Sequence, residues 1–95
     1  MAGYVIADID VTDPVAYQEY VKLTPAIIAK YGGKFLVRGG EAEVVEGTWT
    51  PNRVVVLEFE SLERAKEFYH SEEYRPVMEI RHKSAVSNLV IVEGA

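Results

Sequence analysis

The sequence predicts one α+β domain in which strands and helices follow one another in the order β-α-β-β-α-β. Three observations support this order: short runs rich in β-branched residues, two helical regions with apolar residues three and four apart, and turn-forming residues between them. The chain has 95 residues, which is enough for a single domain over residues 1–95 and leaves no length for a second. Since 48% of the residues are hydrophobic, such a domain can form a core.

The first half of the chain predicts two strands and one long helix. Residues 3–11, GYVIADIDV, form a strand that ends at the turn-forming TDP. Asp13 or Thr12 caps the helix that follows, and its apolar spacing continues to Tyr31. Pro25 lies inside this pattern and predicts a kink or a break. Gly32 suits the left-handed conformation that ends a helix, and residues 34–37 and 41–47 form a second strand around a glycine pair.

The second half predicts two more strands around a second helical region. Residues 53–59, RVVVLEF, form the third strand. Ser61 caps a short helix, and Ser71 caps a further helical stretch over residues 72–85. Residues 88–93 form the last strand. The order corresponds to the ferredoxin-like plan, in which one antiparallel sheet carries the helices on one face. Another small α+β arrangement of the same elements remains the alternative.

The two faces of the predicted sheet differ in polarity. Side chains alternate along strands, and one row in each strand is purely apolar, including Phe35 and Val37 in the second strand. The opposite row consists largely of Tyr4, Ile6, Leu36, Val54 and Val56, with ionisable groups at Asp8, Arg38 and Glu58. A face exposed to solvent should be polar. We therefore expect this row to pack against the same face of a second copy in a homodimer, which encloses a cavity lined by the charges.

Composition and charge argue against several classes of partner. Asp and Glu number 15 against 10 Lys and Arg, and a net charge of −5 disfavours nucleic acid and anionic membranes. The absence of cysteine excludes disulfides and thiolate metal sites, and it fits a reducing compartment. The N-terminus is acidic too early for a signal peptide, and no apolar run approaches the ~20 residues of a membrane span. The expectation is a cytoplasmic protein.

Several segments in sequence order resemble the bacterial domain-of-unknown-function family 1330. They are YGGKFLVRGG, VVEG, RVVVLEF, FYHSEEYRPV and IVEG, and the resemblance runs from about Tyr4 to Gly94. Glu60 and Glu72 stand where the family usually has proline, but a carboxylate is also favourable at a helix start. The resemblance implies the dimeric α/β-barrel superfamily. That superfamily includes cofactor-free monooxygenases, isomerases, haem-handling enzymes and members without known activity, and the resemblance transfers no catalytic residue.

Arg38 is the first candidate for a ligand-binding residue. It follows Phe35 and Val37 at the end of a strand, and Gly39 and Gly40 predict a bulge or bend after it. Such a bend would direct the guanidinium into the cavity, where it could bind a carboxylate through two parallel hydrogen bonds. The alternative is an ion pair between Arg38 and Glu58 or Asp8, within one chain or across two.

Asp8 and Glu58 are the candidate general bases, because a carboxylate on an apolar face tends to have a shifted pKa. The alternative is that one neutralises Arg38 and the other reaches solvent. Tyr69, Tyr74 and Arg81 are further candidates for ligand binding, since Tyr74 and Arg81 are seven residues apart on a helix. The two tyrosines are equally compatible with a place at the edge of the core.

The sequence gives no positive indication of a cofactor or a metal. His70 and His82 have no zinc-binding spacing, and a haem ligand would be supported only by analogy. Two functional hypotheses follow. One is a homodimer that binds a small carboxylate-bearing or aromatic molecule and performs cofactor-free proton transfer or oxygenation with Arg38 and Asp8 or Glu58. The other is a non-catalytic dimeric binding or structural module with internally paired charges.

Overall fold

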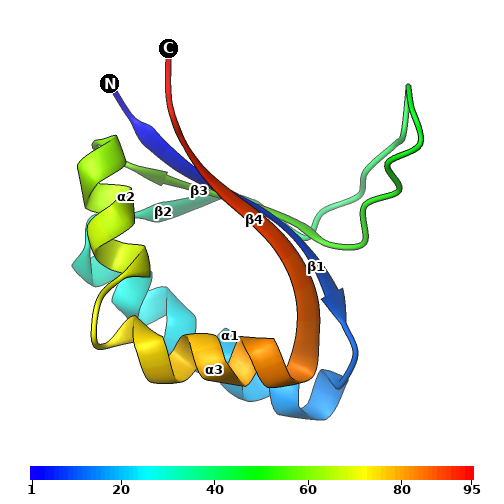
Figure 1. Cartoon of the computed structure of the whole chain (residues 1–95), viewed down its shortest axis with the longest axis horizontal. Coiled ribbons are helices and arrows are strands. Elements are labelled where there is room, and N and C mark those ends of the chain that lie inside the picture. The colour runs from blue at the N-terminus through cyan, green and yellow to red at the C-terminus, as the bar shows by residue number, and fades with distance from the viewer.

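The computed structural model describes residues 1–95 and has an α+β architecture with one four-stranded antiparallel sheet (Figure 1). Its elements are β1 (Gly3–Val11), α1 (Pro14–Lys30), β2 (Lys34–Arg38), β3 (Val54–Phe59), α2 (Leu62–Tyr69), α3 (Tyr74–Ser84) and β4 (Ala85–Glu93). The strands are ordered β2-β3-β1-β4, and all three helices cover the same face of the sheet. This is the ferredoxin-like arrangement, so the predicted fold class is confirmed.

The cap residues position α1 and α2 as predicted. Asp13 accepts a hydrogen bond from the backbone N–H of Ala16, and Ser61 accepts one from that of Arg64. Helix α3 begins at Tyr74 rather than at residue 72, after Glu73, which makes no capping bond, although Ser71 Oγ accepts a hydrogen bond from the backbone N–H of Tyr74. Pro25 lies inside α1 without ending it, so the predicted break does not occur. Pro25 costs the helix one backbone hydrogen bond. Burial of Tyr17, Thr24 and Ile28 along the same helix outweighs that loss.

The last strand begins earlier than the sequence predicted. Helix α3 ends at Ser84, and β4 begins at the next residue, Ala85, rather than at Asn88. Ala85 pairs with Val11, so β4 is hydrogen-bonded along the full length of β1. Pairing with a long neighbouring strand therefore extends β4 over Ala85, which had been assigned to the helix, and over the two residues between the predicted elements.

Strand β2 contains a bulge that reverses two predicted side-chain directions. Phe35 lies opposite Leu57, yet Val37 lies opposite Val56, the very next position on β3. One extra residue in β2 therefore shifts the alternation by one. As a result Val37 lies on the sheet face away from the helices, and Arg38, opposite Val55, lies on the helix-covered face. The predicted directions of Val37 and Arg38 were wrong, because the bulge lies before Arg38 and not at the glycines after it.

Residues 39–53 form a loop that projects from the body of the molecule (Figure 1). The predicted continuation of the second strand over residues 41–47 is wrong, since these residues belong to no strand. The backbone of Gly39 has a φ of 67°, a left-handed conformation that glycine adopts without strain. The chain therefore leaves the sheet directly after Arg38.

The core lies between the sheet and the helices, as the apolar row predicted. Its largest cluster consists of Val5, Ile28, Leu57, Phe59, Ala65, Phe68, Tyr74 and Val77. We call the opposite side of the sheet the open face. The apolar side chains it carries are Tyr4, Ile6, Val37, Val54, Val56, Val86, Val90 and Val92. No helix of the chain is both long enough and apolar enough to span a membrane.

Candidate cavity site

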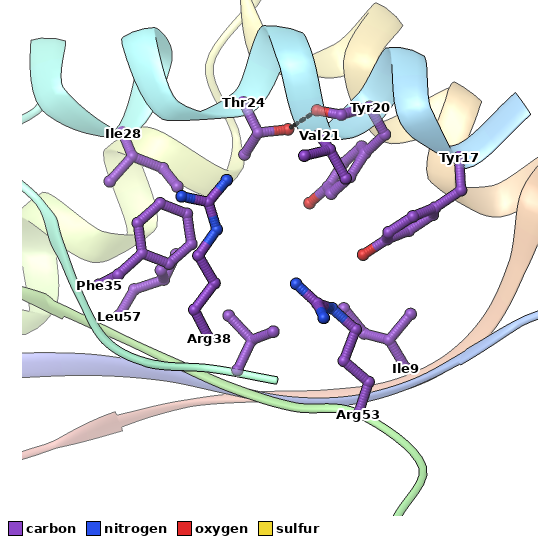
Figure 2. A pocket seen from close by; sticks show the side chains of 11 residues that line it. Ile9, Tyr17, Tyr20, Val21, Thr24, Ile28, Phe35, Arg38, Arg53 and Leu57 are labelled. Carbon is purple, nitrogen blue, oxygen red and sulfur yellow. Dashed lines mark hydrogen bonds between the residues drawn. The ribbon is translucent and has the colours of Figure 1, made fainter. Parts of the chain in front are cut away.

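A cavity lies between α1 and strands β1, β2 and β3 (Figure 2). Eight of its eleven lining residues are hydrophobic. The polar lining side chains are those of Thr24, Arg38 and Arg53, together with the hydroxyl groups of Tyr17 and Tyr20. The volume of the cavity is about 40 Å³. It rises to about 380 Å³ when the open solvent at its mouth is included. The cavity therefore suits a small group.

Two arginines reach this cavity from the two ends of the projecting loop. Arg38 ends β2, and its guanidinium carbon lies 4.3 Å from the centre of the Phe35 ring. Arg53 immediately precedes β3, and its Nε atom is buried without a hydrogen-bond partner. Figure 2 shows both guanidinium groups extending toward the space below α1. The ion pairs of the chain are Lys30–Glu73, Lys34–Glu58 and Arg64–Glu67, so neither cavity arginine is paired with a carboxylate.

Two tyrosines of α1 supply hydroxyl groups on the opposite wall. The hydroxyls of Tyr17 and Tyr20 point toward the space that Arg53 also faces (Figure 2). Burial raises the pKa of Tyr17, and burial together with the neighbouring Tyr74 hydroxyl raises that of Tyr20. Both phenols are therefore neutral at physiological pH and act as hydrogen-bond donors or acceptors rather than as bases.

A second polar layer lies behind Tyr20, inside the core. The Tyr20 and Tyr74 hydroxyl oxygens are 2.6 Å apart. Tyr74 is 2% exposed and Arg81 is 3% exposed, and the Nε and Nη2 atoms of Arg81 have no hydrogen-bond partner. Neither residue lines the cavity itself. Tyr69 lies apart from it as well, in a surface hollow between α2 and α3. The structure thus places Tyr74 and Arg81 next to the cavity wall and Tyr69 elsewhere.

The two candidate bases lie on the open face, away from the cavity. Asp8 accepts hydrogen bonds from Trp49 Nε1 at 2.9 Å and from the backbone N–H of Asn52 at 2.8 Å. These two bonds hold the pKa of Asp8 below its usual range. Glu58 accepts from the Tyr4 hydroxyl at 3.1 Å and pairs with Lys34 Nζ at 3.3 Å. Within the chain, the expected pairing of Arg38 with either carboxylate is therefore absent.

Sequence reasoning missed Arg53, Tyr17 and Tyr20 as cavity residues. A signal for Arg53 was present, because it is the one charged residue in the apolar row that continues with Val55 and Leu57. The tyrosines had no such signal, since an aromatic residue on the inner side of a helix is ordinarily part of a core. No group of three or more acidic, histidine or cysteine side chains lies close enough to hold a metal ion.

Comparison with known proteins gives a family match and several structural neighbours. Residues 2–95 match a family described as a domain of unknown function, DUF1330. No curated protein matches the sequence. The RPA0582 protein of unknown function from Rhodopseudomonas palustris has a TM-score of 0.78 at 18% identity, covering 99% of this chain and 82% of its own.

Two further neighbours are described in more detail. A dimeric protein of unknown function and ferredoxin-like fold from Bacteroides fragilis has a TM-score of 0.64 at 18% identity, covering 98% of this chain and 96% of its own. SnoaB, a cofactor-independent oxygenase from Streptomyces nogalater, has a TM-score of 0.63 at 12% identity. The match covers 99% of this chain and 92% of the SnoaB chain. Likeness at these identities supports the fold alone.

Proposed function

The chain belongs to the DUF1330 family, and from the geometry of its cavity we propose that it binds a small organic acid between α1 and the sheet. The observation that carries this proposal is the pair of guanidinium groups, Arg38 and Arg53, which face one cavity with no carboxylate among its lining residues. Arg38 is exposed and Arg53 is half-buried, with its Nε atom buried and without a hydrogen-bond partner, so an anion in the cavity would supply the counter-charge that both lack.

The chemistry of the lining residues favours a carboxylate attached to an apolar body. A guanidinium group offers parallel N–H donors that match the two oxygens of a carboxylate. Around these donors the lining is apolar, with Ile28, Phe35 and Leu57 at one end (Figure 2). The small volume of the cavity favours a compact apolar body such as a single ring. A small aromatic acid meets all three conditions.

A catalytic role receives less support than binding. No carboxylate or histidine lines the cavity, and Asp8 and Glu58 are on the other side of the sheet. A cofactor-free oxygenation or proton transfer would therefore have to begin from a substrate whose own pKa is lowered by the two guanidinium groups. The likeness to SnoaB makes this a second candidate activity. A module with internally paired charges is disfavoured by the unpaired arginines.

We also propose that the protein is a homodimer built on the open face. This face exposes a row of valines that a monomer would leave in water, including Val37, Val90 and Val92. Packing two such faces together by a two-fold axis would bury them. Two structural neighbours are themselves described as dimeric. In this arrangement the cavity of each subunit lies on the far side of its own sheet.

A thermal-shift comparison of benzoate with benzamide tests the proposed function. The two probes share a ring, but only benzoate is charged. Saturating benzoate should raise the unfolding temperature of the native protein, since a ligand at 100 times its Kd stabilises by about 2.7 kcal/mol. Benzamide should have little effect. Arg53→Met should abolish the benzoate shift, and Arg75→Met, at an exposed arginine outside the cavity, should retain it.

Equal stabilisation by both probes would contradict the proposal, because charge would then play no part in binding. A full benzoate shift in Arg53→Met would contradict it as well.

A further inference from the structure

Tyr20 connects the cavity to a buried pair of residues on α3. Its hydroxyl lines the cavity and lies 2.6 Å from the hydroxyl of Tyr74. Tyr74 and Arg81 are two helical turns apart on one face of α3, and both are almost fully buried. Burial acts to lower the pKa of Arg81, but the neighbouring Tyr74 and Tyr20 hydroxyls raise it above its ordinary value. Arg81 is therefore a buried cation on the same side of α3 as Tyr74, with its Nε and Nη2 atoms lacking a hydrogen-bond partner.

Either hydroxyl could donate in the 2.6 Å contact between Tyr20 and Tyr74, and a guanidinium on the Tyr74 side would favour donation by Tyr74. A guanidinium has donors only and no acceptor, so it can interact favourably with the lone pairs of Tyr74 and not with its proton. The Tyr74 proton is then directed to the Tyr20 oxygen, the one oxygen within hydrogen-bond distance of it. Tyr20 accepts in that bond, and its own proton is free to be donated into the cavity.

We infer that Arg81 and Tyr74 are positioning residues that fix Tyr20 as a hydrogen-bond donor to the bound ligand. The ligand should then carry an oxygen acceptor for Tyr20 in addition to the carboxylate held by Arg38 and Arg53. An aromatic keto acid has this chemistry, since its carbonyl oxygen accepts and does not donate. This inference rests on the proposed function and specifies the class of acid that the cavity selects.

The test is the ratio of two affinities in each variant, measured by calorimetric titration. Benzoate is the reference probe, and benzoylformate and 4-acetylbenzoate add a keto oxygen beside and opposite the carboxylate. The native protein should bind the better keto acid roughly five- to tenfold more tightly than benzoate, as expected for one added hydrogen bond. A general structural disturbance would weaken all three probes together and leave this ratio unchanged.

Removal of the hydroxyl of Tyr20 or Tyr74, or of the Arg81 cation, should abolish or weaken the preference for the keto acid over benzoate. Tyr20→Phe and Tyr74→Phe should each bring the ratio close to one, and the double variant should lose no more than either single variant. Arg81→Met should lower the ratio, and Arg81→Lys should restore part of it because the cation returns. Tyr31→Phe is the matched control, since the Tyr31 hydroxyl bonds to Glu73 outside the cavity.

The outcomes separate the two proposals. If the native protein binds none of the three probes, the proposed function is overturned and the inference with it. If benzoate binds but neither keto acid is preferred, or if the preference survives in Tyr74→Phe, the inference alone is overturned. Tyr74→Phe keeps the aromatic ring in the core, so it decides the matter even if Arg81→Met fails to fold.

Discussion

At the scale of single residues, Gly39 holds the position of Arg53. A Cβ atom at Gly39 would lie 2.1 Å from Nη1 of Arg53, and the backbone there has a φ of 67°. The guanidinium of one cavity arginine therefore occupies the space that a side chain would need. The missing side chain of a loop residue thus contributes to the geometry of the site.

Gly39→Ala is expected to weaken both the fold and the cavity. The left-handed backbone should cost about 1 kcal/mol in the free energy of unfolding. Displacement of Arg53 should reduce benzoate affinity several-fold. Gly40→Ala is the matched control, because nothing lies within 4 Å of a Cβ there and its φ is not positive. Denaturant unfolding and titration check both effects. Equal free energies of unfolding and equal benzoate affinities in the two variants would contradict the role of Gly39.

Asp8 is expected to report its own titration through Trp49. The hydrogen bonds from Trp49 and Asn52 lower the pKa of Asp8 from its ordinary 3.8, so their stabilising contribution is complete at neutral pH. That contribution is lost as the pH falls through the folded-state value. Trp49 is the single tryptophan, so its fluorescence should change with a midpoint below 3.8. The step should vanish in Asp8→Asn. A midpoint above 3.8 would contradict this account.

At the scale of secondary-structure elements, the bulge in β2 decides which face Arg38 reaches. Phe35 and Arg38 both lie on the helix-covered face, although they are three positions apart and plain alternation would put them on opposite faces. The extra residue resolves this conflict, and Leu36 and Val37 are both exposed at the bulge. A local irregularity in an edge strand is thus what places a cation in the cavity.

Two deletions test the role of the bulge. Deletion of Leu36 alone restores plain alternation and still leaves Phe35 and Arg38 on the same face, so benzoate binding should persist within about threefold. Deletion of Leu36 and Val37 together makes Phe35 and Arg38 consecutive and turns Arg38 to the open face. Binding should then fall about tenfold, as expected for the loss of one charge-assisted hydrogen bond. Similar benzoate affinities in the two deletion variants would contradict the claim that the bulge directs Arg38 into the cavity.

The bulge also marks the limit of what could be predicted from the sequence. Strands, helices and caps depend on local spacing and side-chain chemistry, and these were predicted nearly everywhere. The direction of Arg38 depends on the register between β2 and β3, which is a non-local property. The same holds for Arg53 and Tyr20, which line one cavity only because α1 lies over the sheet. Asp8 and Glu58 were correctly placed on one face, but the cavity formed on the other.

At the scale of the whole molecule, the two faces of the sheet have separate roles in this account. The helix-covered face carries the core and the cavity, and the open face carries the proposed contact with a second copy. Binding and assembly would then be independent to a first approximation. A variant that disrupts one should leave the other in place.

Val90→Lys is expected to convert the dimer into a folded monomer. Val90 is 53% exposed in the single chain, so a lysine there should cost the subunit little stability, but it would place a charge in the apolar contact. Light scattering should show half the native mass, with an unchanged circular dichroism spectrum. Val15→Lys, on an 85% exposed residue at the start of α1, should remain dimeric. A native protein that is already monomeric at micromolar concentration would contradict the proposal.

The central claim is that the space between α1 and the sheet is an acid-binding site. The most direct measurement is a crystal structure with 4-bromobenzoate, in which the anomalous signal of bromine locates the ligand. The account predicts the carboxylate within hydrogen-bond distance of Arg38 and Arg53, with the ring between α1 and the sheet. A ligand found instead in the hollow between Trp49 and the open face, or one that contacts neither arginine, would contradict it.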